Sequence, residues 1–322
     1  MREFAPRRRS AVLITGGSGF IGRHLTTALL DAGHRVSILD PIEPLHLAQG
    51  IRWTRGSISD RAAVLKAIAD VEIVVSLAGV SALHHAEQTV WDVNAKGTAG
   101  LARTAAESGV AQLVHISTDA VYGPRVDDGA ASESRPMAPS GPYGESKAAG
   151  EEAVLRLIRV GALRGLVLRP FSVVGPGQKI RPRGSPLLAA ALEAATTGVP
   201  LRIQGDGEQT RDFVSIADLQ AIVLAAISDR ITSDAPVNVG SGCDSSINML
   251  VNLVEQSTGR IIKRSWDRSA SPASGWRASI KRANEVFPGI VREPLGTAIR
   301  RACGLSAPTA TPERASGPRA PT

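Results

Sequence analysis

The chain has 322 residues, of which 43% are apolar and 3% aromatic, and its formal net charge is +7. Two cysteines, Cys243 and Cys303, exclude a disulfide framework and a cysteine-rich metal site, which fits a reducing cytoplasm. The apolar runs are too short to cross a membrane, and the few aromatic residues argue against nucleic acid, so the positive charge better suits an anionic small substrate.

Short strand-like runs alternate with helix-forming segments over the first 174 residues, after a basic segment at 1–10 that we expect to be a solvated, flexible tail. Such alternation predicts an α/β fold with a doubly wound parallel sheet. We expect strands at 11–15, 35–40, 51–54, 71–78, 111–117 and within 163–175, and helices near 20–32, 60–69, 92–108 and from Tyr143 onward.

The composition changes after residue 174, where Pro, Gly and Arg cluster through 175–186. This change predicts that residues 11–174 form one domain and that 175–303 form a smaller α/β region, of which about 212–240 return to the first sheet. The remaining segment, 304–322, is rich in Pro, Ala and Ser, and we expect it to be disordered.

A glycine motif, "TGGSGFIG" at 15–22, follows the first predicted strand and opens a helix. Gly16, Gly19 and Gly22 would permit a tight turn, a close approach of the backbone to a pyrophosphate and close helix packing. The helix N-terminus would then present free N–H groups to the anion. In this strand–turn–helix context the motif predicts that 11–174 is a Rossmann-type dinucleotide-binding domain.

Two acidic residues follow predicted strands of this domain. Asp40 stands about 20 residues beyond the glycines, where a carboxylate accepts hydrogen bonds from the adenosine ribose and repels a 2′-phosphate. The next residues, "PIEP", offer no arginine, so NAD is favoured over NADP; the alternative is that Asp40 only ends a strand. Asp60 is expected to cap a helix, to contact the adenine, or to do both.

Tyr143 and Lys147 lie four positions apart in "GPYGESKAAGEE", at the start of a predicted helix. Pro142 suits the first helical turn, and residues at i and i+4 share one helix face. The phenol and the ammonium would therefore project side by side.

Taken together, these motifs resemble those of the extended short-chain dehydrogenase/reductases, and specifically of the NAD-dependent nucleotide-sugar epimerases and dehydratases. The resemblance covers about residues 11–300. It rests on "TGGSGFIG", "GSISD", "VNAKGT", "STDAVYG", "YGESK", "LRPFSVVGPGQ", "GDGEQTRDFVSIAD" and "VNVGSG", in this order.

The resemblance implies a set of site residues. Thr118, Tyr143 and Lys147 would be catalytic. Substrate would contact Thr118, Asp119, Ser172, Arg211 and Arg268, with Arg211 near the diphosphate; Arg268 rests on a looser alignment. NAD would contact Gly16, Gly19, Phe20, Ile21, Gly22, Asp40, Ser57, Ile58, Asp60, Leu77, Ala78, Gly79, Asn94, Ser117, Tyr143, Lys147 and Pro170.

In the mechanism that the resemblance implies, Tyr143 takes the proton of a sugar hydroxyl while the carbon that bears this hydroxyl gives a hydride to NAD⁺. A free phenol has a pKa near 10. A cation about 4 Å away contributes on the order of 4 kcal/mol at an effective dielectric constant of about 20. We therefore expect Lys147, helped by the charge of the nicotinamide, to lower the pKa of Tyr143 by a few units toward neutrality. Thr118 would hydrogen-bond the same sugar oxygen.

The triplet Thr118–Asp119–Ala120 separates the candidate reactions. Similar sugar 4,6-dehydratases carry Thr-Asp-Glu there, whereas this chain has no glutamate. An epimerase resembling UDP-hexose 4-epimerases is therefore favoured. A dehydratase, a dehydrogenase or reductase of the same fold, and a non-catalytic dinucleotide sensor remain alternatives. Ser172 stands where an asparagine is usual, which leaves the nucleotide and the sugar open.

The expected partners are a nucleotide-diphosphate sugar and a second copy of the chain. In this resemblance homodimers form through the helix near 94–108 and the Tyr143 helix. His84 and His85 have no further ligand at metal spacing, so we expect them in a loop and expect no metal site. Nucleic acid and membrane are not expected partners.

Overall fold

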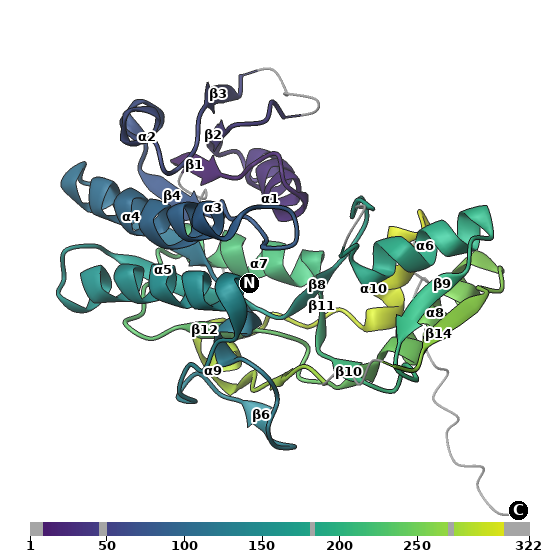
Figure 1. Ribbon diagram of the computed structural model, residues 1–322. Helices are drawn as coiled ribbons and strands as arrows, with labels where there is room; N and C mark the ends of the chain where they lie inside the picture. Colours follow the sequence, from purple (N-terminus) through teal and green to yellow (C-terminus); the bar gives the residue numbers. More distant parts are fainter. Residues whose placement is uncertain (1–8, 45–49, 181–183, 270–273, 306–322) are drawn as a thin grey trace, which may run out of the picture.

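The computed structural model describes residues 9–44, 50–180, 184–269 and 274–305, and Figure 1 shows the arrangement of its elements. Seven parallel strands form the main sheet. Their order places β1 between β4 and β2, so the chain winds outward from β1 in both directions, and the predicted α/β fold is confirmed. The strands in sheet order are β12 (Val237–Val239), β7 (Gly165–Pro170), β5 (Gln112–Ile116), β4 (Ile73–Ser76), β1 (Ala11–Thr15), β2 (Arg35–Asp40) and β3 (Arg52–Arg55).

Helices cover both faces of this sheet, since its aliphatic strands are buried on both sides. On one face lie α1 (Phe20–Asp31), α7 (Ile216–Ser228) and α9 (Lys281–Val286). On the other lie α2 (Arg61–Ile68), α4 (Thr98–Glu107) and α5 (Gly141–Arg159), and α4 and α5 run side by side (Figure 1). The strand order reverses between β1 and β4, where ligands bind in such folds.

The helix expected near 92–108 begins earlier and is interrupted. Its first part is α3 (Glu87–Trp91), which continues through a π-helical segment, Asp92–Gly97, into α4. The extra residue in this segment turns Asn94 toward the loop after β4 and toward α5. Similarly, the strand expected within 163–175 is divided into β7 and β8 (Ser172–Val174) at Phe171, whose amide donates to the carbonyl of Val239.

The smaller region has its own apolar core, formed by α6 (Leu187–Thr197), α8 (Ile247–Thr258) and α10 (Leu295–Ala302). The strands outside the main sheet pair two by two. These pairs are β9 (Leu201–Gln204) with β14 (Arg264–Asp267), β10 (Thr210–Arg211) with β13 (Ser245–Ser246), β8 with β11 (Phe213–Ser215), and β6 (Ala130–Ala131) with β15 (Arg277–Ala278).

Segments beyond residue 211 contribute to both parts of the molecule. The helix α7 packs on α1, and β12 adds the seventh strand to the main sheet. At the other end, Ser10 is buried and its hydroxyl accepts a hydrogen bond from Arg230, so Ser10 belongs with β1 rather than with a solvated tail. Both predicted tails otherwise fall largely on residues 1–8 and 306–322, outside the described ranges. No helix within the described ranges is long and apolar enough to cross a membrane.

Candidate functional site

The glycine motif forms a tight turn between β1 and α1, as predicted. Gly16 adopts a left-handed backbone conformation with φ of 75°, and a Cβ atom there would lie 2.9 Å from the Cα of Ala78. A Cβ on Gly22 would lie 2.3 Å from the carbonyl oxygen of Gly16. No side chain caps α1 at Gly19, so the N–H groups of its first turn, which includes Phe20 and Ile21, are open to an anion. This turn fits the pyrophosphate of NAD.

Asp40 lies directly beside this turn. One of its carboxylate oxygens accepts the amide of Ser18 at 3.0 Å, and the other accepts the amide of Ile42 at 2.9 Å. The side chain is buried at the end of β2. Carboxylate oxygens can accept further hydrogen bonds, so Asp40 fits the adenosine ribose that lies next to the pyrophosphate in this type of fold.

The loop after β4 packs against the glycine turn that follows β1, at the place where the strand order reverses. The amides of Leu77 and Ala78 both donate to the hydroxyl of Thr15, at 3.1 and 3.2 Å. A Cβ on Gly79 would lie 3.2 Å from the amide oxygen of Asn94. Asn94 also donates to the hydroxyl of Ser146 on α5, at 3.1 Å. These contacts bring together the predicted cofactor residues of the turn after β1, the loop after β4 and the π-helical segment.

Ser57, Ile58 and Asp60, which are predicted to contact NAD, lie in the segment after β3. The carboxylate of Asp60 accepts the amides of Ala62 and Ala63, so Asp60 caps α2. The side chain of Ile58 is buried in the core beneath α2 and α4, and a contact of its backbone with NAD stays a prediction. The Ser57 hydroxyl accepts the amide of Ser59. An adenine contact by this segment stays a prediction.

The predicted catalytic residues meet at the C-terminal end of β5. Thr118 follows this strand, and its hydroxyl accepts the amide of Ala120, capping the short 3₁₀ helix η2 (Asp119–Tyr122). Lys147, on α5, is buried and donates to the carbonyl of Ile116 at 2.9 Å. Tyr143, one turn earlier on α5, hydrogen-bonds with Thr118. The spacing of Tyr143 and Lys147 thus places both residues against β5.

Lys147 does not lower the pKa of Tyr143 in this structure, and the contribution expected from the nicotinamide charge stays a prediction. Burial raises the pKa of the phenol above its ordinary value, the hydrogen bond with Thr118 lowers it, and the charge of Asp119 raises it further. The ammonium of Lys147 is directed to a backbone carbonyl instead. Burial also lowers the pKa of Lys147 to about 8, and the Glu151 carboxylate opposes this change.

Asp119 is the acidic group beside this pair. Burial raises its pKa to about 6, while the Thr118 hydroxyl and the charge of Arg211 lower it, and Asp212 raises it. The carboxylate accepts the Thr118 hydroxyl at 3.2 Å. Asp119 therefore titrates within the range in which enzymes work.

A cavity of about 690 Å³ is lined by residues of β8, β9 and β11 and by the start of α6. Ser172 and Arg211, both predicted to bind substrate, line it, together with Gln178, Arg202 and Gln204. Arg211 interacts electrostatically with Asp119, which links this cavity to the Tyr143 side of the site. Pro170, at the end of β7, is buried two residues before Ser172.

Other predicted residues lie apart from this site. Arg268 is exposed in the turn after β14 and is not among the described residues that line the cavity. His84 and His85 are exposed in the loop between β4 and α3, as expected. Within the described ranges, no three His, Cys, Asp or Glu side chains are grouped to hold a metal ion.

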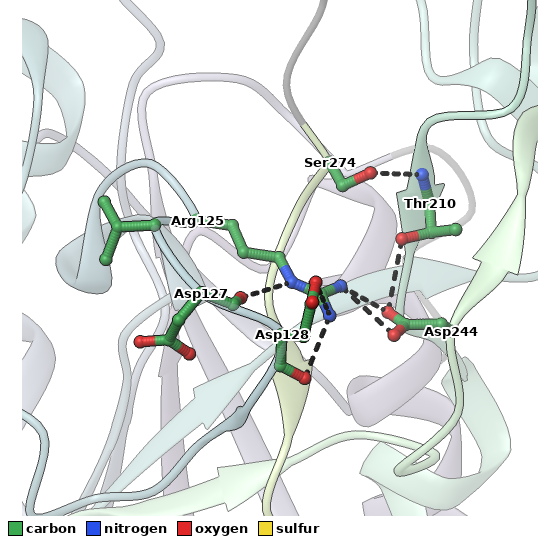
Figure 2. Close-up of a pocket in the computed structure, with 7 residues that line it drawn as sticks. Arg125, Asp127, Asp128, Thr210, Asp244 and Ser274 are labelled. Carbon is green, nitrogen blue, oxygen red and sulfur yellow. Dashed lines mark hydrogen bonds and ion pairs between the residues drawn. The ribbon is translucent and has the colours of Figure 1, made fainter.

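A second cavity, of about 600 Å³, lies around Arg125 (Figure 2). Its guanidinium donates to both carboxylate oxygens of Asp244, at 3.0 and 3.1 Å, and to the carbonyls of Asp127 and Asp128. Thr210 and Ser274 complete one wall. Because Arg125 is paired with these groups, the residues described as lining this cavity offer no unpaired cation to an anionic substrate.

Sequence reasoning missed a buried polar network behind the site. Glu151 accepts the hydroxyl of Ser117 at 2.5 Å and pairs with Arg169 on β7. Arg169 donates to Tyr122, which donates to Asn238 on β12. One signal was available in the sequence, since Glu151 continues the i, i+4 series of Tyr143 and Lys147 on the face of α5 that meets the sheet.

Comparison with known proteins agrees with this geometry. The sequence model of the "NAD dependent epimerase/dehydratase family" matches residues 12–240. The chain belongs to this family. The resemblance deduced from the motifs is thereby confirmed, and the prediction of NAD agrees with the dependence that defines the family.

Relatives of this family member differ in activity. A dTDP-6-deoxy-L-talose 4-dehydrogenase (NAD(P)(+)) of Kitasatospora kifunensis is 36% identical over 316 residues, which cover 92% of each chain. A UDP-glucose 4-epimerase of Neisseria meningitidis serogroup B is 29% identical over 78% of this chain and 83% of its own. The structure of a UDP-glucose 4-epimerase with UDP-glucose from Thermotoga maritima has a TM-score of 0.83 at 24% identity, over 91% and 97% of the two chains, and supports the fold.

Proposed function

We propose that this NAD dependent epimerase/dehydratase family member inverts a ring carbon of a nucleotide-diphosphate sugar through a transient keto sugar. The observation that carries the proposal is the meeting of Thr118, Tyr143 and Lys147 at the C-terminal end of β5, which only β4 separates from β1 and its glycine turn. A phenol, a hydroxyl and a buried ammonium at one point are the groups needed to move a hydroxyl proton.

Each residue of this set has a distinct role in the proposal. Tyr143 takes the proton from the sugar hydroxyl, and Thr118 orients the same oxygen. Lys147 binds the nicotinamide ribose and places a positive charge near the developing phenolate. When bound, NAD supplies the hydride acceptor, which can later return the hydride. The raised pKa of Tyr143 means that the phenolate depends on these positive charges at neutral pH.

Ala120 is the reason for favouring inversion over loss of water. Elimination across C5 and C6 requires a base for the C5 proton and an acid for the leaving hydroxyl. Asp119, with its pKa of about 6, can act as an acid, but the methyl group of Ala120 cannot accept a proton. The route that remains is rotation of the keto sugar, followed by return of the hydride to its other face.

The cavity lined by Ser172 and Arg211 suits the nucleotide diphosphate. Arg211 provides a planar fork of donors that matches phosphate oxygens, and it lies between the cavity and Asp119. We propose that the diphosphate binds at Arg211 and Ser172, with the nucleoside deeper in the cavity and the sugar toward Tyr143. An adenine contact by Asp60 and a phosphate contact by the exposed Arg268 belong to the same proposal.

A 4-dehydrogenase is the second candidate, because the relative that is 36% identical over 92% of both chains bears that name. The first chemical step would be the same, with Tyr143 as base. The two activities differ in the fate of the cofactor: a dehydrogenase releases NADH at each turnover, whereas an epimerase ends each turnover as NAD⁺.

We also propose that the protein acts as a homodimer in the cytoplasm. The dimer would form through α4 and α5, whose outer faces carry small residues such as Gly100 and Ala149. Cys243 and Cys303 are both free, in keeping with a reducing compartment.

The test is incubation with a panel of UDP-, dTDP- and GDP-sugars in deuterated water, followed by mass spectrometry and product stereochemistry. An epimer keeps the mass of the substrate and gains no carbon-bound deuterium. A product lighter by one water, or one that carries solvent deuterium on carbon, would contradict the proposal in favour of a dehydratase. Stoichiometric NADH would favour the dehydrogenase.

A further inference from the structure

The carboxylate of Glu151 lies behind the Tyr143 side of the site, on the same helix face. Tyr143, Lys147 and Glu151 follow one another at intervals of four residues along α5. Each meets the end of β5 or the residues directly after it: Lys147 binds the carbonyl of Ile116, and Glu151 accepts the hydroxyl of Ser117 at 2.5 Å. Tyr143 meets the next residue, Thr118.

Arg169 fixes the Glu151 carboxylate in this position. Its Nε lies 3.0 and 3.1 Å from the two carboxylate oxygens, and one Nη atom donates to the same group. The other Nη donates to the hydroxyl of Tyr122 at 2.8 Å. Glu151 and Arg169 are almost completely buried, with 0% and 3% of their surface exposed.

Through Tyr122 the same network holds the η2 turn. Thr118 caps the start of this turn, and Tyr122 ends it. The Tyr122 hydroxyl donates to the side-chain oxygen of Asn238 at 2.7 Å, and Asn238 in turn donates to the carbonyl of Ala131. Asp119, which faces the sugar in the proposed function, lies between Thr118 and Tyr122, the residues that hold the two ends of this turn.

Stability is a weak reason for such a pair. Burying two charges costs several kcal/mol in desolvation, and apolar replacements of buried ion pairs are often neutral or stabilising. The contacts made by Glu151 and Arg169 instead lead to residues of the proposed site. Glu151 is also the charged group that opposes the effect of burial on Lys147, whose pKa lies at about 8.

We propose that Glu151, fixed by Arg169, is a positioning residue for hydride transfer, acting through Ser117 on Thr118 and through its charge on Lys147. The inference rests on the proposed function for its reaction, but not for its geometry. Glu151 contacts neither the substrate nor the reacting atoms in this arrangement. It sets the distance between β5 and α5 and keeps Lys147 protonated.

The charged and titratable groups around Lys147 come from four elements. Glu151 and Tyr143 lie on α5, His115 on β5, Arg169 on β7 and Asp119 on η2. Burial and the charge of Lys147 hold the pKa of His115 well below its usual range, so His115 is neutral at pH 7. The positive charge of Arg169 is paired with Glu151. A substitution at position 151 therefore changes the pKa of Lys147 through the loss of the Glu151 charge itself.

The experiment follows Lys147 by NMR in protein labelled with ¹³C at the lysine Cε. The chain has six lysines, and Lys147→Met identifies the relevant signal. In Glu151→Gln the side chain can still accept the Ser117 hydroxyl, but its charge is lost. We expect the pKa of Lys147 to fall by about one pH unit or more, since a nearby opposite charge shifts a pKa by about 1–3. Turnover should fall at least about fivefold at pH 8, because the protonated fraction of Lys147 falls by about that factor, and should recover in part at pH 6, with KM for the sugar nucleotide nearly unchanged.

Two further variants separate the effect of the position of Glu151 from the effect of its charge and from a general loss of protein stability. In Ser117→Ala, turnover should fall severalfold while the titration of Lys147 stays unmoved. Glu255→Gln breaks a half-buried pair with Arg264 in the smaller region, so it should lower stability and leave both readouts as in the wild type. Unchanged Lys147 titration and unchanged turnover in Glu151→Gln would overturn the inference.

The double variant Glu151→Gln/Arg169→Gln also removes the charge that Arg169 would otherwise leave without its partner, and gives the same NMR readout where the single variant unfolds. A wild type that converts no sugar nucleotide would contradict the proposed function alone, because the titration of Lys147 in the two proteins still tests the effect of Glu151.

Discussion

The ammonium of Lys147 lies 2.9 Å from the carbonyl oxygen of Ile116, and this hydrogen bond joins α5 to the last residue of β5. It explains how the four-residue spacing of Tyr143 and Lys147 leads to a site. Lys147 is held at the strand end, and Tyr143, one turn toward the helix N-terminus, is carried to Thr118.

Tyr143→Phe should lower turnover by at least about 100-fold, the usual range for loss of an acid–base group, because no other phenol stands beside Thr118. The ring keeps its packing, so fold and NAD affinity should be retained. Turnover of the sugar nucleotide and NAD binding by fluorescence titration check this prediction.

The other tyrosine of the chain provides the matched control. Tyr122→Phe removes a hydroxyl that is bonded to Arg169 and Asn238 inside the network, and burial raises the pKa of that hydroxyl to about 12. We expect a loss of about 1–3 kcal/mol in the free energy of unfolding, because buried partners are left unpaired. Near wild-type turnover in Tyr143→Phe would remove Tyr143 from the role of base.

Asp40→Ala should narrow the preference for NAD over NADP by about tenfold or more, which corresponds to about 1.4 kcal/mol. The carboxylate that repels a 2′-phosphate is lost, as are its hydrogen bonds to the amides of Ser18 and Ile42, so NAD affinity should also fall. Dissociation constants for both cofactors provide the measurement. Asp31→Ala, at the far end of α1, serves as a control, and equal affinity of the wild type for both cofactors would contradict the assignment.

Asp119→Asn should stabilise the protein at pH 8 but not at pH 3.5. The folded state raises the pKa of Asp119 from 3.8 to about 6, so it holds this proton more tightly than the unfolded chain does. The favourable contribution of protonated Asp119 is complete below about pH 4 and is lost as the pH rises through 6. Asparagine avoids this loss, and we expect a gain of about 2 kcal/mol at pH 8, reduced for partial solvent exposure. Denaturant unfolding at both pH values measures it; a gain independent of pH would show that ionisation is not the cause.

Gly100→Arg should dissociate the proposed homodimer without unfolding the monomer. A Cβ atom at Gly100, on α4, meets no other atom within 4 Å, and arginine favours helix more than glycine does. Light scattering should therefore give the dimer mass for the wild type and the monomer mass for the variant. Gly296→Arg on α10 is the control, since a Cβ there makes only an ordinary contact, 3.6 Å from Leu253. A monomeric wild type would reject the dimer itself.

The features that could be predicted from the sequence are those encoded by neighbouring residues. The glycine turn, the cap formed by Asp60 and the shared helix face of Tyr143 and Lys147 each depend on spacings of a few residues. The alternation of strands and helices likewise predicted the parallel sheet, because each short apolar run is a buried strand.

The rest depends on contacts between residues that are distant along the chain. Glu151 and Ser117 are 34 positions apart along the chain, and Tyr122 and Asn238 are 116 positions apart. No local sequence pattern therefore predicts either hydrogen bond. The π-helical turn at Asn94 was missed because helix propensity does not reveal one extra residue in a turn. The raised pKa of Tyr143 in the protein alone could not be predicted, because burial and the charge of Asp119, both of which oppose ionisation, depend on the folded structure.

The stripe of Tyr143, Lys147 and Glu151 also limits how α5 can vary in length. Insertion of one residue between Lys147 and Glu151 would turn the carboxylate by about 100° around the helix axis and separate it from Ser117 and Arg169. A deletion would have the same effect in the opposite sense. Point substitutions at exposed positions such as Glu145 and Ala149 leave the stripe intact, so between Tyr143 and Glu151 this helix can change its residues but not their number.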